Sequence, residues 1–184
     1  MKTLLIIAML VGSSLVHAEE FSVLQTAKSS ISFVSKQMSV PVNGKFGRFN
    51  AQITFDPNKT ANGKARIEID MSSIDAGSEE ANDEVKGKDW FNIKEFATAK
   101  FESTGIKAGG GRYEASGKLT IKNVTRNVNV PFIAKIEAGS AVLEGGIQIS
   151  RQQFGIGTGE WADVSTVADE VQLHFKLAVA TAKK

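Results

Sequence analysis

The fold of this chain is constrained most by an alternation of apolar and polar residues with a period of two, which recurs along almost its whole length. From Phe49 to Phe55, for example, every second residue is apolar and the residues between are polar. Such alternation gives a strand one buried and one solvated face, which is typical of antiparallel sheets. The segments that carry it are residues 31–33, 49–55, 65–71, 99–103, 113–121, 128–136, 143–149 and 171–179.

These eight segments predict a sheet that closes on itself. A single antiparallel sheet without a second layer of helices must curl or split to cover its apolar face, and closure also removes the exposed edges. An eight-stranded barrel has an interior that side chains fill or that holds one small ligand. We therefore expect an all-β, eight-stranded antiparallel barrel with one or two short helices between strands. A sandwich without a cavity is the alternative.

One helix is well signalled. Ser78 can cap residues 79–86, whose first turns are acidic, as the helix dipole favours. Gly87 suits the left-handed position after the helix. Ala81 and Val85 give the helix a thin apolar stripe. The acidic residues are not spaced as in a calcium loop, so we interpret them as a solvated helix face.

An aromatic segment precedes one of the strands. Trp90 and Ile93 have the spacing of one face of a helical turn, and Phe91 adds further apolar surface. From Ala99 the period changes to two, as in a half-buried strand. This order predicts an aromatic lid or wedge that packs against the sheet.

The start of the chain has the pattern of a secretory signal peptide, over residues 1–18. Lys2 gives a positive start, residues 4–16 are mostly apolar, and Val16-His17-Ala18 resembles a small-residue cleavage site. The apolar run is shorter than the roughly 20 residues that span a bilayer. We therefore expect export, cleavage after Ala18 and a single domain over residues 19–184.

The charge balance gives no electrostatic reason for binding nucleic acid or an anionic membrane surface. Lysine and arginine number 22 against 20 acidic residues. The chain has no cysteine, so burial must stabilise the fold without disulfides. After the signal peptide no apolar run has spanning length, and we expect no stable membrane insertion.

Residues suited to catalysis are few, and we expect neither an enzyme nor a cofactor or metal site. His174 should point to solvent, because it alternates with Leu173 and Phe175. Asp163 and Asp169 are interpreted as loop acids rather than an acid–base pair. The glycine-rich segment 155–159 lacks the Lys-Ser/Thr of a phosphate-binding loop, and a flexible turn or a close backbone approach explains it better.

Several short motifs resemble the YceI-like family of secreted bacterial proteins. They are Asn43–Gly47, Phe55-Asp56, Trp90–Thr104, Gly117–Thr125, Arg151–Ile156 and Asp169–Val171. The resemblance covers nearly the whole chain after the signal peptide. It implies a periplasmic protein with an elongated, lipocalin-like antiparallel barrel, whose apolar pore binds a polyisoprenoid or another long-chain amphiphilic lipid.

The inward-facing residues of the strands are the candidate lining of such a pore. Alternation alone favours a plain core, whereas the family resemblance favours a pore. The candidates are Phe33, Phe49, Ile53, Phe55, Ile67, Ile69, Trp90, Phe101, Leu119, Ile121, Val130, Phe132, Ile147, Phe154, Leu173 and Phe175. A phosphate head group would favour a cation at the rim. The candidates are Arg48, Arg126 and Arg151, of which only Arg151 lies in a family motif.

Two classes of function follow. The first is a non-enzymatic periplasmic carrier whose partner is a long-chain isoprenoid or fatty amphiphile, with a homodimer as a further candidate. The second is an accessory protein with a filled barrel, which docks a membrane redox or envelope-stress partner. The two functions differ in whether the interior of the barrel is empty or filled by side chains.

Export predicts a processed N-terminus. N-terminal sequencing of the protein recovered from the periplasm of its own cell should begin at Glu19, because cleavage is expected after Ala18. A mature chain that retains Met1 would contradict the predicted signal peptide.

Overall fold

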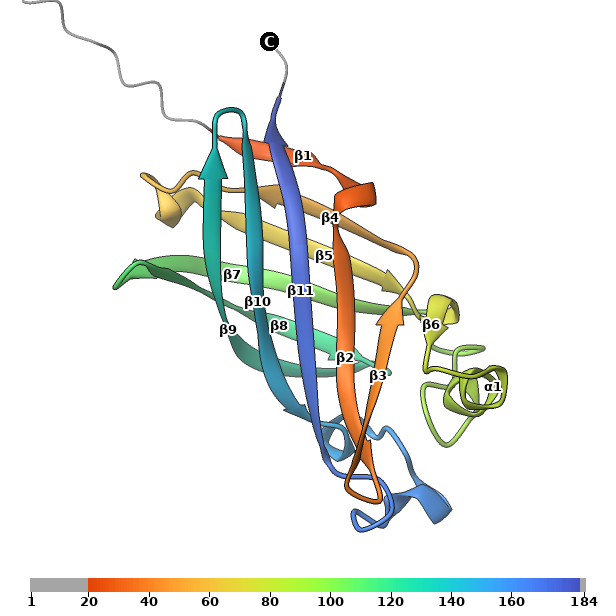
Figure 1. Cartoon of the computed structure of the whole chain (residues 1–184). Helices are drawn as coiled ribbons and strands as arrows, with labels where there is room; N and C mark the ends of the chain where they lie inside the picture. The colour runs from red at the N-terminus through yellow and green to blue at the C-terminus, as the bar shows by residue number, and fades with distance from the viewer. Residues whose placement is uncertain (1–19, 183–184) are drawn as a thin grey trace, which may run out of the picture.

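The computed structural model describes residues 20–182, and the predicted signal peptide lies outside the described residues. These residues form one 11-stranded antiparallel sheet that curls on itself (Figure 1). Figure 1 shows β4, β5 and β7 crossing behind β2, β10 and β11, so that two layers of the same sheet face each other. Within residues 20–182, no helix combines the length and the apolar character that a membrane span requires.

The strands vary in length from two to 14 residues. They are β1 (Phe21–Leu24), β2 (Ser30–Gln37), β3 (Val40–Phe46), β4 (Phe49–Thr54), β5 (Lys64–Asp70), β6 (Ile74–Asp75), β7 (Thr98–Gly109), β8 (Arg112–Ile121), β9 (Val124–Glu137), β10 (Ser140–Ser150) and β11 (Glu170–Thr181). The helices are α1 (Glu79–Lys86) and the 3-10 turns η1 (Thr26–Lys28), η2 (Thr60–Asn62), η3 (Met71–Ser73), η4 (Gln152–Phe154) and η5 (Gly159–Ala162).

Two connections draw the ends of the sheet together. The strand order is β4-β5-β7-β8-β9-β10-β11-β2-β3-β6, with β1 paired to β11. The Phe21 N–H of β1 donates to the Phe55 carbonyl at 2.9 Å, and the Phe55 N–H returns the bond at 3.1 Å. β1 therefore links β11 to the end of β4. The second connection is the pair Gly47 and Arg48, which joins β3, near one end of the strand order, to β4 at the other end.

The all-β antiparallel class is confirmed, but the predicted count of eight strands is wrong because β1, β3 and β6 were missed. β1 and β6 are four and two residues long, too short to show alternation. β3 contains Pro41 and Gly44, which interrupt the apolar pattern. Gly44 lies opposite Phe33 of β2, and a Cβ there would stand 2.1 Å from the Phe33 ring. The ring thus occupies the place of the missing side chain.

The predicted helix forms with the expected cap. The Ser78 Oγ accepts a hydrogen bond from the Ala81 N–H at 3.2 Å. Gly87, however, has a φ of −65° and an extended backbone, so the predicted left-handed conformation is wrong. The expected helical turn at Trp90 and Ile93 is also wrong: the chain makes consecutive turns there, and Asn92 has a φ of +46°.

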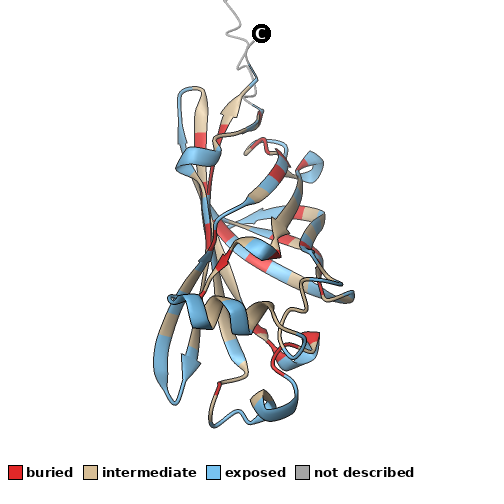
Figure 2. Cartoon of the chain, turned by 90° about the vertical axis from the view of Figure 1, so that its right-hand side faces the viewer, coloured by how far each residue is buried: buried red, intermediate tan, exposed pale blue. Residues whose placement is uncertain are grey.

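The buried residues form two clusters along the curled sheet. One is packed by aromatic side chains: the rings of Phe55 and Tyr113 meet edge to face, with centroids 5.0 Å apart, and Phe132 stacks on Tyr113 at 5.2 Å. The other contains Phe46, Met71 and further residues near α1. α1 itself carries no buried residue, and the view in Figure 2 shows exposed and intermediate colours there.

A glycine in β10 gives a test of this packing. Gly145 lies opposite Phe132 and Phe175, and an added Cβ would stand 2.3 Å from the Pro131 carbonyl oxygen. Gly145→Ala should therefore lower the free energy of unfolding by about 1–3 kcal/mol, as overpacking does. Gly109→Ala is the control, because nothing lies within 4 Å of its added Cβ. Equal urea midpoints for the two variants would contradict the packing described.

Candidate functional site

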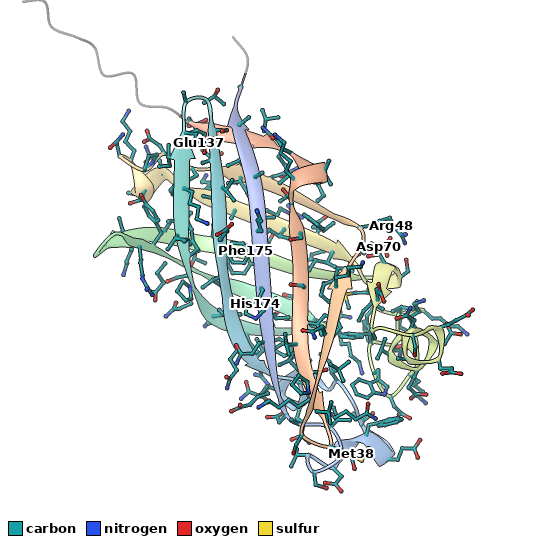
Figure 3. The ribbon with its side chains drawn as sticks, viewed as in Figure 1. Met38, Arg48, Asp70, Glu137, His174 and Phe175 are labelled. Carbon is teal, nitrogen blue, oxygen red and sulfur yellow. The ribbon has the colours of Figure 1, made fainter. Side chains whose placement is uncertain are left out.

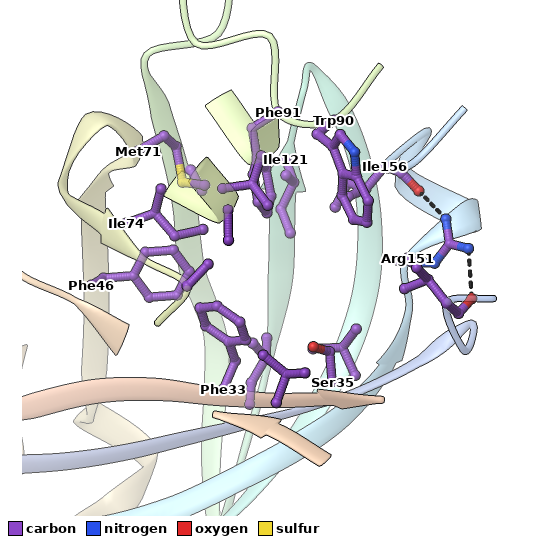
Figure 4. A pocket seen from close by; sticks show the side chains of 18 of the residues that line it. Phe33, Ser35, Phe46, Met71, Ile74, Trp90, Phe91, Ile121, Arg151 and Ile156 are labelled. Carbon is purple, nitrogen blue, oxygen red and sulfur yellow. Dashed lines mark hydrogen bonds between the residues drawn. The ribbon is translucent and has the colours of Figure 1, made fainter. Parts of the chain in front are cut away.

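A cavity of about 430 Å³, partly open to solvent, lies beside α1. Its walls come from β2 and β3, from the inner faces of β7 and β8, and from α1 with the segment after it (Figure 4). Most of its lining is apolar, including Phe33, Phe46, Met71, Ile74, Phe91 and Ile121.

A second cavity of about 120 Å³ lies on the side of the first that faces the aromatic cluster. The two cavities share four lining residues, Ile31, Ile69, Leu119 and Leu173. These four side chains form the boundary between the cavities, which we call the junction. A linear apolar molecule that occupied both would have to pass this junction.

Most of the predicted pore residues line these two cavities. The larger one is lined by Phe33, Ile69, Trp90, Leu119, Ile121 and Leu173. The smaller one is lined by Ile53, Phe55, Ile67, Ile69, Phe101, Leu119, Val130, Phe132, Ile147, Leu173 and Phe175. Phe49 and Phe154 line neither: Phe154 is 2% exposed within the second cluster, and Phe49 packs against both clusters.

The larger cavity also has walls that the alternation did not indicate. Phe46 and Ile74 come from β3 and β6, which are too irregular or too short to show a period of two. Trp161 and Val167 come from the connection between β10 and β11. Of these, only Phe46 lay in a motif that signalled its importance.

The segment after α1 forms a wedge at the cavity. The Trp90 and Phe91 side chains line it, together with Ala81 and Val85 of α1. The Phe91 N–H donates to the Val85 carbonyl at 3.0 Å, which joins the wedge to the helix. The predicted apolar stripe of α1 therefore faces the cavity.

Polar side chains gather where the cavity reaches solvent. Gln37 of β2 and Glu80 and Glu84 of α1 line the cavity and are exposed. The two carboxylates give this mouth a negative charge at neutral pH.

Arg151 is almost fully buried, at 1% exposure. Its guanidinium donates five hydrogen bonds of 2.7–3.1 Å, all to backbone carbonyls, and Figure 4 shows it beside the cavity. The acceptors belong to residues Ile156, Gly157, Trp161, Val167 and Ala168. Since a guanidinium has five N–H donors, none is left for a ligand, and the predicted head-group contact does not fit this geometry.

The glycine-rich segment makes this arrangement possible. Gly157 has a φ of +72°, and a Cβ there would stand 2.2 Å from the Arg151 Nη1. The glycine allows the close backbone approach that the sequence predicted. Burial lowers the pKa of the Arg151 guanidinium, and the nearby Asp169 carboxylate opposes that shift.

Trp90 and Trp161 pack against each other beside this guanidinium. Their ring centroids are 5.5 Å apart, and the Arg151 Cζ lies 5.7 Å from the centroid of Trp90. Such a distance allows a cation–π interaction. Both indole Nε1 atoms are buried and have no hydrogen-bond partner. An unpaired buried donor of this kind costs about 1–3 kcal/mol.

The residues considered for catalysis do not converge. His174 is exposed on the outer face of β11, as predicted (Figure 3). The Asp163 carboxylate accepts a hydrogen bond from the Ser165 N–H, which lowers its pKa. Among residues 20–182, no group of histidine, cysteine or acidic side chains is placed to hold a metal ion.

The hydrogen bonds of Arg151 predict a structural role. Arg151→Lys should lower the free energy of unfolding of the ligand-free protein by about 3 kcal/mol or more, because a lysine cannot satisfy all five carbonyls. Arg126→Lys is the control, since Arg126 is exposed and donates to a single carbonyl, that of Gln153. Urea unfolding measures both. A variant at position 151 with unchanged stability but lost ligand binding would instead indicate a head-group contact.

Comparison with known proteins places the chain in a family. A YceI-like domain model matches residues 23–179. The crystal structure of Burkholderia cenocepacia BcnA is 47% identical, with a TM-score of 0.82, and the match covers 84% of this chain and 98% of that one. A polyisoprenoid binding domain from Saccharophagus degradans is 15% identical, with a TM-score of 0.68 over 89% of this chain and 99% of that one, which shows the fold alone.

Relatives known from sequence match over shorter lengths. A UPF0312 protein of Photorhabdus laumondii is 35% identical over 46% of this chain, and the match spans 44% of that protein's length. A UPF0312 protein of Pseudomonas aeruginosa is 29% identical over 71% of this chain and 69% of its own length. The curled antiparallel sheet, its apolar cavities and the domain match agree, and the chain belongs to the YceI-like domain family.

Proposed function

We propose that this chain is an exported, periplasmic binding protein that carries a long-chain amphiphilic lipid, of the polyisoprenoid type, in its two adjacent cavities. The observation that carries the proposal is the apolar cavity of about 430 Å³ and the smaller cavity beyond the junction. A structural neighbour described as a polyisoprenoid binding domain supports it.

The size of the space favours a ligand over a packing defect. Ligand pockets in proteins usually measure about 300–1,000 Å³. A space of about 430 Å³ falls in that range, and a bound apolar chain would bury the apolar side chains that line it.

The shape of the space favours a long and narrow molecule. The larger cavity opens near Gln37 and α1, and the smaller one ends at the packed rings of Phe55, Tyr113 and Phe132. An amphiphile can place its polar end near the open part and its chain beyond the junction.

The alternative, an accessory protein with a filled barrel, is favoured only by the aromatic cluster. Phe55 and Phe132 are 0% and 6% exposed and fill one end of the curled sheet. The other end contains the cavity of about 430 Å³, which docking to a partner protein does not require. We therefore prefer the carrier.

The junction gives a test by chain length. Leu119→Trp adds bulk where the two cavities meet, so it should block long chains and spare short ones. Geraniol and solanesol are a matched short and long isoprenoid alcohol. For the wild type, saturating solanesol should raise the melting temperature by about 5–10 °C. Leu119→Trp should lose that shift and keep the smaller shift with geraniol.

A surface variant controls for nonspecific effects of the lipids. Arg126→Lys should keep both shifts, because Arg126 is exposed and lines neither cavity. If neither alcohol nor any other long-chain lipid shifts the wild-type melting curve, the carrier proposal fails.

A further inference from the structure

The turn between β2 and β3 presents apolar side chains to solvent. Met38 is 70% exposed and Val40 is 63% exposed, and Val164 of the β10–β11 connection is 52% exposed. The Met38 N–H donates to the Thr166 carbonyl at 2.8 Å, which holds the turn against that connection. Both segments lie at the end of the molecule opposite the end of β11 (Figure 1), where Figure 3 labels Met38. We call Met38, Val40 and Val164 the apolar tip.

The apolar tip continues the lining of the larger cavity. Val42 of β3 lines that cavity, and so do Ser35 and Gln37 of β2, which pair with Val42 and Val40. Because side chains alternate along a strand, Val40 points to the same side as Val42 and lies one step beyond the lining. Val167 of the β10–β11 connection also lines the cavity. Apolar surface therefore runs from the cavity out to the tip.

The backbone of the turn is unfavourable for the residues that form it. Met38 has a φ of +47° and Ser39 a φ of +67°. Two-residue hairpin turns with positive φ favour Asn-Gly, and a bulky side chain in this region is uncommon. Strain of this kind gathers at functional sites. Met38 gains little packing within the protein, so its place in the turn indicates a contact outside the protein.

The size and chemistry of the tip favour a lipid surface over a protein partner. Stable protein interfaces bury about 800 Å² per partner and are enriched in aromatic side chains and arginine. Three aliphatic side chains are too few for such an interface, but they can enter a lipid surface, where binding grows with the apolar area buried. Among residues 20–182, the exposed large apolar side chains include no aromatic ring: they are Val23, Met38, Val40, Ile133, Ile136 and Val164.

The charges around the tip give an anionic membrane no electrostatic attraction. Lys36 lies on one tip segment, and Glu160 and Asp163 lie on the other. Glu80 and Glu84 line the mouth of the cavity. Carboxylates at this end repel a negatively charged surface, so apolar contact must supply the attraction. A neutral, zwitterionic lipid surface fits these side chains.

We propose that the apolar tip docks reversibly on a zwitterionic lipid surface and sets the mouth of the larger cavity against it. The inference rests on the proposed carrier function, because a long-chain lipid that moves between a bilayer and the cavity would otherwise have to cross water. The contact is peripheral and weak, and it differs from stable insertion into the membrane.

A fluorophore at the tip tests the docking and its orientation. The chain has no cysteine, so one introduced cysteine takes a nitrobenzoxadiazole label at a single place. Ser39→Cys places the label at the tip, and Ala138→Cys places it in the exposed turn between β9 and β10, at the opposite end (Figure 1). With vesicles of palmitoyl-oleoyl-phosphatidylcholine, emission from position 39 should brighten and shift to the blue, and emission from position 138 should not change.

The labelled and unlabelled proteins are recovered from the periplasm and confirmed to begin at Glu19. The apolar residues 4–16 of an unprocessed chain would themselves bind lipid.

Met38→Asn separates docking from folding. Asparagine adopts a positive φ more readily than methionine, so the urea midpoint should stay the same or rise. The variant loses the apolar side chain, however, and should bind the vesicles about tenfold more weakly in a sedimentation assay.

A matched pair of substitutions tests the position of the docking surface. Val40→Thr and Ile136→Thr each remove an exposed apolar side chain and keep a β-branched one, at opposite ends of the sheet. Val40→Thr should weaken vesicle binding by about threefold, and Ile136→Thr should leave it unchanged.

Four results would overturn the docking inference. They are no binding of the wild type to the vesicles, wild-type binding by Met38→Asn and Val40→Thr, binding that requires phosphatidylglycerol and is lost in high salt, and a dimer that depends on Met38 without vesicle binding. The melting shift with solanesol is measured separately, with the alcohol delivered from cyclodextrin. If that shift persists without docking, the carrier proposal stands alone; if docking persists without the shift, the carrier proposal fails.

Discussion

The wall of the cavity depends on one buried guanidinium. Residues 151–169 connect β10 to β11 with two 3-10 turns, and one isolated bridge, between Val167 and Gln37, joins them to β2. Arg151 supplies further hydrogen bonds, since its donors bind five carbonyls of this connection in the fixed fork geometry of the side chain. The same five bonds place Ile156, Trp161 and Val167 against the cavity. A residue that resembles a ligand contact therefore serves as a scaffold.

The interior changes along its length from filled to hollow. At one end the rings of Phe55, Tyr113 and Phe132 occupy the space between the layers, and the backbone of Gly145 lets the sheet approach Phe132. At the other end, side chains of β3, β6 and α1 line the cavity of about 430 Å³ (Figure 1). One continuous sheet thus provides both the stability of a packed core and a space for a ligand.

The strands could be predicted because burial of one face leaves a period of two in the sequence, and most of the predicted pore residues do face the cavities. Strands in which this period is interrupted could not be predicted from the sequence. Gly44 and Pro41 hide β3, and the bulge between Ser103 and Gly105 hides the second half of β7. The burial of Arg151 and the approach of Trp161 to Trp90 depend on contacts between distant segments, which leave no local pattern.

Because α1 is only lightly packed, the rate at which it opens locally can be high although the rate at which the sheet unfolds is low. The helix is capped by Ser78 and contributes Ala81 and Val85 to the cavity, but none of its residues is buried. Little apolar surface would be exposed if α1 alone moved away, so the free energy of that local opening is small beside that of unfolding the sheet. Amide hydrogens of α1 would then exchange with solvent long before those of β10 and β11. Ligand exchange can be rapid in a protein whose sheet resists unfolding and proteolysis.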